Sequence, residues 1–512
     1  MKRIYLLLLS ALFLTIVSCR KNYLETYSST AVTQQQIFAQ IATIKNSLIG
    51  TGKELFAFSP SGSGRHDDYG QKSIDLQMDV MGNDMVIHAQ GYGWYNRVYQ
   101  YTSWATPADG AISSNVWYYY YDIVKQANQL LSVIDGVADA TAEDKAKVKG
   151  QLLGYRAYCY YFLINLWQQT YKGHEDFPGV PLYTGGELEP KGRGTVKQVY
   201  NQIIQDLSTA ETLLDGQSRA DVTEINVDVI RGFRARVALL MEDWPTAAQY
   251  ANLARQGYTL INGNDIDPVN NTTLFSSIAT PEWMWGAYIP EVDATYYASF
   301  FSHVDIMTGG YASLGGQKKI TKVLYDSIPD SDRRKLWWTA PGTWVSNGAD
   351  PNDPNVDYNQ VKHEAADPNT WASDYLFMRA SEMYLIEAEA EARQGHDAVA
   401  QNVMRDLIAS SNRNPSYDPT IYSGQDLINH ILLQRRIELW GEGFSLIDIK
   451  RTHTGLQRPQ GPENHWGLNC TGKTNYNPIL FNTSDADPRF LMRIPQKELD
   501  NNTSMTANDQ NP

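Results

Sequence analysis

Cysteine is rare in this sequence, with three copies among 512 residues. So few thiols exclude a disulfide scaffold and a multi-cysteine zinc or iron–sulfur site. Positively charged residues are outnumbered by negatively charged ones. The sequence has 43 lysines and arginines and 57 aspartates and glutamates, which gives a formal net charge of −14. Phosphate backbones need a positive field, so we predict that the protein binds no nucleic acid.

The sequence also lacks the motifs H-E-x-x-H, G-x-S-x-G and C-x-x-C. Residues 50–53 resemble the end of a phosphate-binding loop, but Ser47 replaces its first glycine and Glu54 its magnesium-binding Ser or Thr. We therefore predict no enzymatic activity, no catalytic residues, no metal and no cofactor. The sequence does not exclude a pair of carboxylates of the glycosidase type, because the distance between them depends on the tertiary structure. Structural calcium is not excluded either, since the turns at 262–267 and 350–357 are rich in oxygen ligands.

The N-terminus carries a short apolar run, Ile4–Val17, after Lys2 and Arg3. The run is too short to span a bilayer and is typical of a secretion signal. Ile16-Val17-Ser18-Cys19 resembles the lipobox of bacterial lipoproteins, which implies that residues 1–18 are removed and that Cys19 is acylated. We expect the mature chain to be held at the membrane by lipid rather than by a spanning helix.

The clearest internal pattern is helical. Apolar residues spaced alternately three and four apart in 142–168 lie on one face of a helix. They are Val148, Leu152, Tyr155, Cys159, Phe162 and Leu166. The same reasoning predicts further helices at about 33–49, 111–135, 196–214, 226–242, 245–256, 374–394, 398–410 and 424–440. Their short separations favour antiparallel helix pairs.

Two of these helix pairs resemble each other at an offset of 153 residues. The turn Glu242-Asp243-Trp244 corresponds to Gly395-His396-Asp397, and small residues flank both turns. Such residues allow the close helix approach of tetratricopeptide repeats. We therefore predict a mainly α fold, a tetratricopeptide-like superhelix of helix pairs at about 111–256 and 374–451.

The segments 50–110 and 257–372 have little periodicity and are rich in Gly, Asn, Asp, Pro and aromatic residues. Long loop-rich insertions are uncommon without a function, so we expect these parts to face the ligand within a single domain of residues 19–512. Aromatic residues are abundant, with 13 Trp, 32 Tyr and 14 Phe. Such rings offer flat faces to apolar C–H surfaces such as those of sugars, while neighbouring polar groups bind hydroxyls. The candidate ligand-binding residues in these two segments are Trp94, Asn96, Arg97, Trp104, Trp283, Trp285, Tyr288, Tyr296 and Tyr297.

Residues 435–451, RRIELWGEGFSLIDIKR, are similar to the motif R-R-x-E-L-x-x-E-G-x-R-x-x-D-x-x-R of the SusD/RagB family of Bacteroidetes nutrient-uptake lipoproteins. Ser445 departs from it, so an ion pair of the family's arginine is absent or replaced. We interpret the Arg and Glu residues of the motif, including Glu438 and Glu442 on one predicted helix face, as structural ion pairs. Further segments resemble the family in its order: WYYYYDIVKQAN at 117–128, FPGVPL at 177–182, EDW at 242–244, the alanine-rich 377–390, IPQKE at 494–498 and the closing QNP.

The resemblance implies a SusD-like fold and a surface lipoprotein of the outer membrane that is anchored through Cys19. Such a protein would capture an oligosaccharide on a shallow aromatic surface and deliver it to a SusC-like TonB-dependent transporter, against which its helical half packs. Three alternatives stay open: the same role for peptides, a secreted glycan hydrolase, and a purely structural repeat protein.

Overall fold

Most of the chain is described by a computed structural model. The described residues are 40–87, 91–102, 111–186, 189–267, 270–342, 357–461, 463–465, 483 and 486–512. Cys19, Trp104 and Cys470 lie outside them. Cys159 is buried, as expected for a small core residue, and has no disulfide partner within the described part of the chain. Among the described residues, no helix is both long and apolar enough to cross a lipid bilayer.

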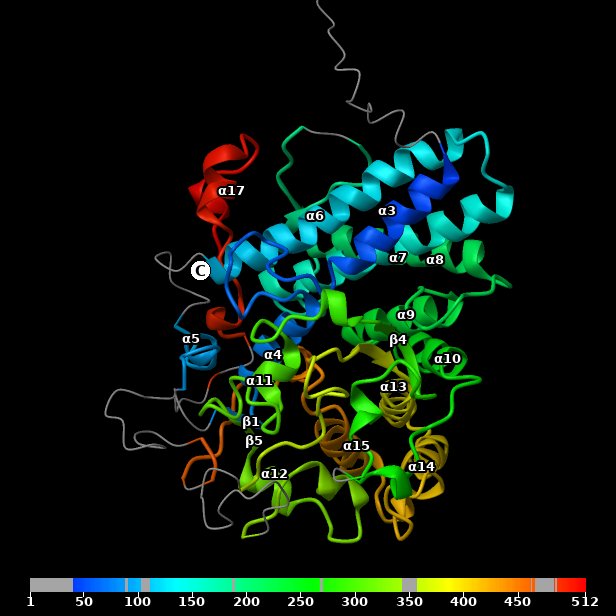
Figure 1. Cartoon of the computed structure of the whole chain (residues 1–512). Helices are drawn as coiled ribbons and strands as arrows, with labels where there is room; N and C mark the ends of the chain where they lie inside the picture. Colours follow the sequence, from blue (N-terminus) through cyan, green and yellow to red (C-terminus); the bar gives the residue numbers. More distant parts are fainter. Residues whose placement is uncertain are drawn as a thin grey trace, which may run out of the picture.

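Long helices dominate the architecture and follow one another from the top of the molecule down its right side (Figure 1). They are α3 (Ile41–Lys53), α6 (Ala111–Val133), α7 (Ala142–Trp167), α8 (Val196–Leu214), α9 (Val227–Met241), α10 (Trp244–Ala254), α13 (Ala380–Arg393), α14 (Asp397–Arg405, continued by a π-turn at Asp406–Ser410) and α15 (Gly424–Glu438). The mainly α prediction is therefore confirmed.

Capping and close packing explain these helices. Thr141 and Thr195 begin α7 and α8 with capping boxes, whose side chains pair with the first-turn amides. Helix α7 comes close to its neighbours at two glycines. A Cβ atom at Gly150 would lie 2.5 Å from Leu214, and one at Gly154 would lie 2.9 Å from Ile230. Only a residue without a side chain allows this approach.

The internal repeat is also confirmed. Helices α9 and α10 form one pair and α13 and α14 the other, and α10 packs against α13. Each first helix is followed by a residue in the left-handed region, Glu242 at φ 58° and Gly395 at φ 79°. These two residues are 153 positions apart, so the sequence offset reflects two equivalent turns. Ala247, Ala251 and Ala400 are buried where the helices meet.

Strands are few and short. Three antiparallel pairs are present in the described part: β1 (Met85–Ile87) with β5 (Lys318–Ile320), β2 (Pro178–Pro181) with β3 (Arg193–Thr195), and β4 (Trp283–Ala287) with β6 (Tyr375–Arg379). Strand β6 corrects the predicted helix at 374–394, whose first residues pair with β4 before α13 begins. The run Tyr-Leu-Phe-Met-Arg is buried throughout, and periodicity does not distinguish such a strand from a helix.

Two further predictions need correction. The first helix spans Ile41–Lys53 rather than 33–49, of which residues 33–39 lie outside the described residues. Helix α4 (Gln71–Val80) lies inside the segment 50–110, which was expected to be loop-rich. All ten of its residues are buried although six of them are polar, and its apolar residues Ile74, Leu76, Met78 and Val80 alternate with polar ones, a period that favours a strand over a helix.

Short helices connect the remaining parts. Helices α5 (Asn96–Tyr99), α11 (Phe300–Val304) and α12 (Lys322–Asp326) lie with β1 and β5 on the left of Figure 1. Helices α16 (Ser445–Arg451) and α17 (Gln496–Asn501) follow α15 in the chain. The C-terminal segment is held near α7, because the Gln510 amide exchanges two hydrogen bonds with the Ile494 backbone and Asn511 donates to Trp167 O.

The Arg- and Glu-rich motif forms a buried ion-pair network, as predicted. Glu438 is fully buried and contacts Arg334, Arg379 and Arg413 at 3.1, 2.7 and 3.0 Å. Glu442 accepts from Arg379 at 2.8 Å. The prediction that Glu438 and Glu442 share one helix face was wrong, because α15 ends at Glu438 and Glu442 lies in the turn that follows.

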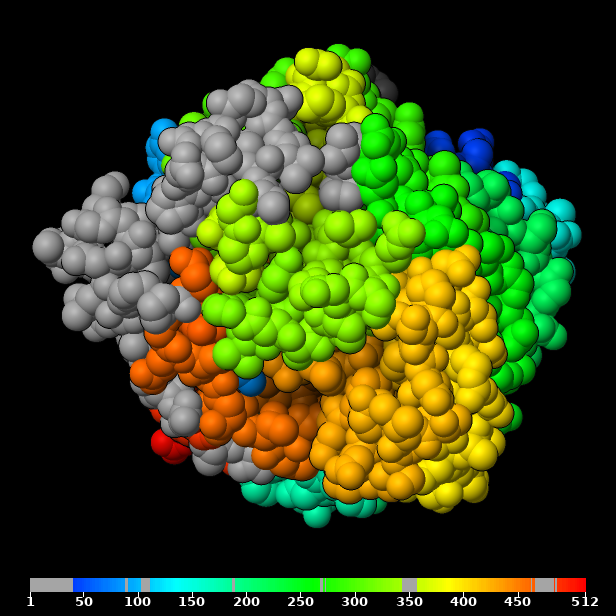
Figure 2. Space-filling model, turned by 90° about the horizontal axis from the view of Figure 1, so that it is seen from below, coloured from blue at the N-terminus to red at the C-terminus, as the bar shows by residue number. Residues whose placement is uncertain are grey.

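Seen from below, the surface is formed by α12, α14, α15 and the 440–461 segment, and it is hollowed where the last two meet (Figure 2). The hollow corresponds to a cavity of about 380 Å³ between α15, α16 and the turn before β1. Arg436 lines it and binds Asp84 with two hydrogen bonds of 2.8 and 2.5 Å.

Candidate functional site

Eight rings from five loops meet on the side of the molecule where α5 and α11 lie. They come from the loop before α4, the turn before α5, the loop before α11, the turn after it and the loop before β6. We call this set the aromatic surface: Phe58, His66, Tyr92, Trp94, Tyr296, Tyr297, Tyr311 and Trp371.

Tyr311 lies at the centre of this set. Its ring centroid is 5.6 Å from that of Trp94, 5.3 Å from Tyr297 and 5.2 Å from Tyr92. His66 stacks on Trp94 at 5.7 Å with an interplanar angle of 20°. The two aromatic stretches proposed from sequence, near 94 and near 297, are therefore brought together through Tyr311.

Exposure differs among these rings. Tyr311 and Trp371 are buried, His66 and Trp94 are half-buried, and Phe58, Tyr92, Tyr296 and Tyr297 are exposed, with Tyr92 at 70%. The buried rings support the exposed ones from below, so the faces available to a ligand are held in place before binding. Preorganisation of this kind lowers the entropy lost when a ligand binds.

Close turns position the rings. A Cβ atom at Gly91 would lie 2.9 Å from the Gly315 carbonyl, so only glycine lets the turn of Tyr92 and Trp94 pack on the turn of Tyr311. Trp371 has φ 59°, a strained value for an aromatic residue. Such strain persists where the surrounding structure fixes it and is concentrated at functional sites.

Hydrogen bonds fix the histidines of this region. His66 Nδ1 lies 2.7 Å from the Tyr311 hydroxyl, and His303 Nε2 lies 2.9 Å from the His66 carbonyl. Burial, together with the nearby Lys318 ammonium, holds the pKa of His303 well below its usual value. His303 is therefore neutral at pH 7 and supports the loop without adding charge.

One arginine borders the rings. The Arg65 guanidinium lies 5.4 Å from the Trp94 ring centroid and binds both carboxylate oxygens of Asp67 at 2.8 Å. Cation–π contact and the fork-shaped ion pair hold this side chain in one orientation. Its partly exposed donors lie next to a flat apolar ring, which is the combination that a sugar hydroxyl and a sugar C–H face require.

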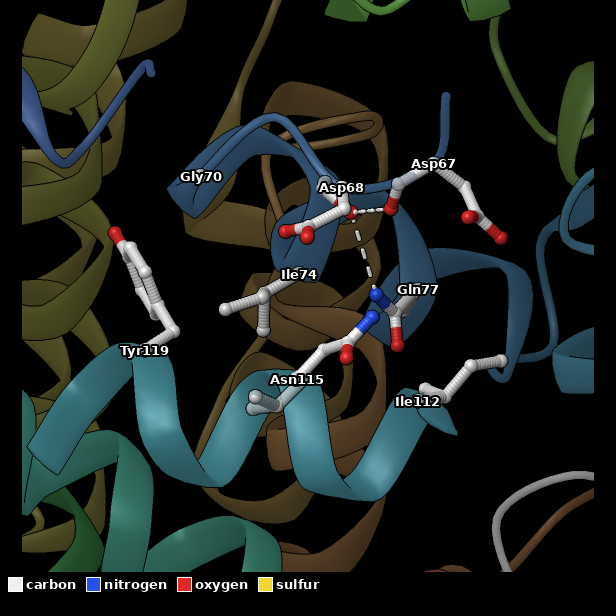
Figure 3. Close-up of a pocket in the computed structure, with 10 residues that line it drawn as sticks. Asp67, Asp68, Gly70, Ile74, Gln77, Ile112, Asn115 and Tyr119 are labelled. Atoms are coloured by element: carbon white, nitrogen blue, oxygen red, sulfur yellow. Dashed lines mark hydrogen bonds between the residues drawn. The ribbon is translucent and has the colours of Figure 1, made fainter. Parts of the chain in front are cut away.

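The loop that carries His66 is anchored on α4. Asp68 accepts hydrogen bonds from the Ser61 and Ser63 hydroxyls at 2.5 and 2.6 Å. Ser73 of α4 donates to the Asp67 carbonyl and accepts from Gln77 (Figure 3). Behind the loop, facing α6, a cavity of about 20 Å³ has room for one water molecule.

The candidate ligand-binding residues proposed from sequence lie in different parts of the structure. Trp94, Tyr296 and Tyr297 belong to the aromatic surface. Arg97 is exposed on α5, the helix that follows Trp94. Trp104 lies outside the described residues.

Tyr288 and Asn96 depart from the expectation. Tyr288 is 56% exposed but lines a separate cavity of about 440 Å³ between α3, α7 and β4. Asn96 is buried at the start of α5, so its amide does not face a surface ligand as expected.

The prediction that Trp283 and Trp285 are surface rings is wrong. Each is 1% exposed on β4. Their indole N–H groups donate to Leu274 O at 3.1 Å and Thr223 O at 3.3 Å. Trp285 packs against Phe377, Phe233 and Tyr158, and its edge forms part of the inner wall of the Tyr288 cavity. Side chains alternate between the two faces of a strand, and those that face a layer of packed helices belong to the core.

Five rings of the aromatic surface were not among the candidates. One is Tyr92, which lies beside the candidate Trp94, and the other four are Phe58, His66, Tyr311 and Trp371. All four lie in the segments 50–110 and 257–372, which the sequence marks as aromatic-rich and irregular. A usable signal was the presence of isolated rings in Gly-rich turns, such as Gly309-Gly310-Tyr311. Each ring stands alone in its turn, so local aromatic density did not reveal it.

The arrangement is suited to binding. The described residues contain no group of three or more His, Cys, Asp or Glu side chains placed to hold a metal ion. The aromatic surface instead offers ring faces, tyrosine hydroxyls and one guanidinium. Such groups hold a ligand through stacking and hydrogen bonds.

Comparison with known proteins agrees with the fold. Residues 64–239 match the sequence model described as SusD-like, starch-binding associating with outer membrane, and residues 333–512 match the model of the SusD family. A search of proteins of curated function finds no significant sequence match.

Solved structures cover nearly the whole chain. A SusD-like carbohydrate binding protein from Bacteroides vulgatus ATCC 8482 is 25% identical, with 93% of this chain and 98% of that chain covered and a TM-score of 0.76. A SusD superfamily protein from Bacteroides thetaiotaomicron VPI-5482 is 20% identical, with 92% and 100% covered and a TM-score of 0.73. Surface glycan-binding protein A from Bacteroides thetaiotaomicron, in complex with laminarihexaose, is 15% identical, with 92% and 99% covered and a TM-score of 0.67. On these matches, the chain belongs to the SusD/RagB family.

Proposed function

We propose that this protein is a non-enzymatic, surface-exposed lipoprotein of the outer membrane that captures oligosaccharides and delivers them to a SusC-like TonB-dependent transporter. The observation that carries the proposal is the aromatic surface, in which the central Tyr311 contacts rings from three other loops and Trp371 of a fifth loop joins through Tyr297. The starch-binding description of the matched family model supports a glycan as the ligand, as does the laminarihexaose complex of a protein with this fold.

The chemistry of capture follows from the exposed rings. A pyranose ring presents C–H groups on its faces and hydroxyls at its edge. Tyr296 and Tyr297 offer ring faces, while Arg65 and the tyrosine hydroxyls bind hydroxyls. Hydrogen bonds to water are exchanged for bonds to protein, so the net affinity per sugar is modest and release remains fast.

Two features support attachment and delivery. The lipobox-like Ile16–Cys19 would place an acyl anchor at Cys19, and several acyl chains at roughly 0.8 kcal/mol per buried CH₂ hold a protein at a membrane durably. The helical pairs would supply the face that packs on the transporter. A Cys19→Ser variant is expected to lose incorporation of labelled palmitate and to leave the membrane fraction. Retention of the label would reject the anchor.

Calorimetric titration tests glycan capture, using laminari-, malto-, cello-, xylo- and manno-oligosaccharides and, separately, mixed peptides. The matched pair is Tyr296→Ala and Tyr288→Ala, because both side chains are 56% exposed and only Tyr296 belongs to the aromatic surface. We expect heat with one glycan class, weakened about tenfold by Tyr296→Ala and unchanged by Tyr288→Ala.

Three other results would change the proposal. Heat with peptides alone would move the protein to peptide import. Release of reducing sugar during the titration would support a hydrolase. Equal effects of Tyr288→Ala and Tyr296→Ala would place the ligand elsewhere than on the aromatic surface.

A further inference from the structure

A second aromatic groove lies away from the aromatic surface, between α6, the loop after β2 and α17. These elements lie at the top of Figure 1, whereas α11 lies below them. The groove has a volume of about 320 Å³. Its aromatic lining consists of Trp117, Tyr118, Tyr121 and Tyr183, and it shares no residue with the aromatic surface.

Three of these rings are fixed by contacts outside the groove. Trp117 packs on Trp167 with ring centroids 5.0 Å apart, and the Tyr121 hydroxyl donates to the Pro181 carbonyl at 2.8 Å. The Tyr183 amide donates to the Tyr160 hydroxyl at 2.6 Å, and the Tyr183 hydroxyl accepts the Lys191 amide at 3.2 Å. The groove is therefore formed before any ligand arrives.

Tyr118 differs from the other three. Its ring is half-buried on α6 with the Lys497 ammonium 5.6 Å from its centroid. Burial, followed by the charges of Glu498 and Asp122, raises the pKa of Tyr118 to about 12. At neutral pH its hydroxyl is thus a hydrogen-bond donor beside two carboxylate acceptors.

The polar groups around the rings carry both signs of charge. Asp122 and Glu498 supply two carboxylates, Lys125 lines the groove, and the ammonium groups of Lys497 and Lys191 lie 5.6 and 5.5 Å from the Tyr118 and Tyr183 ring centroids. Gln129 adds an amide, which both donates and accepts. A hydroxyl both donates and accepts, so a site that offers donors and acceptors of both kinds suits a ligand with many hydroxyls.

We propose that this groove is a second carbohydrate-binding site, which takes one or two neutral sugar rings. The inference rests on the proposed function only in assuming that the ligand is a glycan. A volume near 300 Å³ is at the small end of ligand pockets, so the groove accommodates a short stretch of a glycan rather than a long one. Two sites on one protein raise its effective affinity for a polysaccharide that reaches both.

An extended peptide is the competing occupant. Aromatic grooves that bind proline-rich peptides commonly combine with acidic residues that select a basic side chain. Here the ammonium groups of Lys125, Lys191 and Lys497 accompany the two carboxylates, so a basic side chain is not selected. The groove chemistry therefore favours a sugar, and peptide binding becomes an outcome of the test.

The test separates the two sites by mutation of the full chain. A variant carrying Trp94→Ala and Tyr296→Ala removes the aromatic surface as a site. Into it we would introduce Tyr118→Ala or Glu498→Gln, the latter because glutamine keeps the acceptor that the Asn502 amide uses at 2.9 Å. Tyr250→Ala is the matched control, since Tyr250 is also half-buried on a helix with a cation, Arg234, over its ring.

Saturation-transfer NMR with methyl glycosides and disaccharides of the sugars named above detects binding at each stage. We expect the aromatic-surface variant to retain binding, Tyr118→Ala and Glu498→Gln to weaken that residual binding about tenfold or more, and Tyr250→Ala to leave it intact. Thermal unfolding of each variant shows whether its fold is retained.

Each remaining outcome decides the question. Loss of all sugar binding in the aromatic-surface variant would overturn the second site and leave the proposed function standing. Residual sugar binding that is unchanged by both Tyr118→Ala and Glu498→Gln would overturn it as well. If the groove bound a proline-rich peptide and no sugar, the ligand would be a peptide. If the wild-type protein bound none of the sugars, both proposals would be rejected.

Discussion

The rings of His66 and Tyr297 are parallel to within 4°, with their centroids 6.3 Å apart. His66 lies in the loop before α4 and Tyr297 in the loop before α11, and helices α6 to α10 lie between these loops in the sequence. Both rings contact Tyr311, whose hydroxyl lies 2.7 Å from His66 Nδ1. Two parallel faces held by one hydrogen-bonded ring form a fixed platform for a flat ligand.

We predict that His66→Ala weakens oligosaccharide binding about tenfold, because it removes one of the parallel faces and loosens Tyr311. His66→Phe keeps the ring but not the hydrogen bond and should retain most of the affinity. Tyr311→Phe, which removes the other partner of the hydrogen bond, serves as the control in the same calorimetric titration. If the His66→Phe variant bound the oligosaccharide as weakly as the His66→Ala variant, the hydrogen bond rather than the ring face would determine the affinity.

The scaffold could be predicted from sequence because its helices carry apolar residues at helical spacing. Helix α8 buries one such face, α7 carries the stripe from Val148 to Leu166 although its other faces are buried as well, and the offset between Glu242 and Gly395 corresponds to two equivalent turns. Helix α4 and strand β6 were missed because neither has the period of the element that it forms. Strand β6 is a nearly continuous apolar run, whereas α4 alternates apolar and polar residues from Ile74 to Val80, which favours a strand.

The candidate site could be predicted only in part. Aromatic density drew attention to Trp94 and Tyr297, but it drew equal attention to Trp285, which is core. Burial of a ring on a short strand depends on what covers that strand, and this is a tertiary property. His66 and Trp371 stand alone in their loops, and only the fold brings them to Tyr297.

The buried network around Glu438 leads to a stability prediction. Glu438→Gln leaves Arg334, Arg379 and Arg413 without one shared negative charge, and breaking a buried ion pair in this way costs about 3–5 kcal/mol. Glu224→Gln is the control, because Glu224 and Lys147 form a 2.8 Å pair that is partly exposed. That pair should contribute about 0–1 kcal/mol. Urea denaturation at pH 7 measures both variants, and equal losses would contradict a special role for the network.

Buried carboxylates also give stability a pH dependence. Arg379 and Lys362 hold the pKa of Glu442 at about 2, and Arg451 and Arg393 hold that of Glu389 at about 2, below the ordinary 4.5. A carboxylate with a lowered folded-state pKa stabilises the protein fully above its unfolded value. This stabilisation is lost as the pH falls from about 4.5 towards 2. Denaturation curves measured across this range should therefore show a steep loss, and a flat profile would contradict the assignment.

A pair of glycines tests the close packing beneath Ser445. A Cβ atom at Gly82 would lie 2.4 Å from the Ser445 Cβ, so Gly82→Ala forces α16 and the turn before β1 apart. We expect a loss of about 1–3 kcal/mol. Gly50→Ala is the matched control, because Gly50 is inside α3 and a Cβ atom there would have no neighbour within 4 Å, so the substitution should stabilise by about 0.5–1 kcal/mol. Chemical denaturation gives both values, and a neutral Gly82→Ala would show that the contact relaxes freely.

Glu364 leads to a prediction of the opposite sign from Glu442. Burial, together with the charge of Asp305, raises the pKa of Glu364 to about 8. A carboxyl group whose folded-state pKa is raised favours folding most below its unfolded value of about 4.5, and this advantage declines as the pH rises to about 8. Glu364→Gln removes the titrating group, and each pKa unit corresponds to about 1.4 kcal/mol. We therefore expect the variant to gain stability over the wild type at pH 9, with a much smaller difference at pH 4. Urea denaturation at the two pH values measures the gain, and an equal difference at both would mean that Glu364 is not buried as a neutral acid.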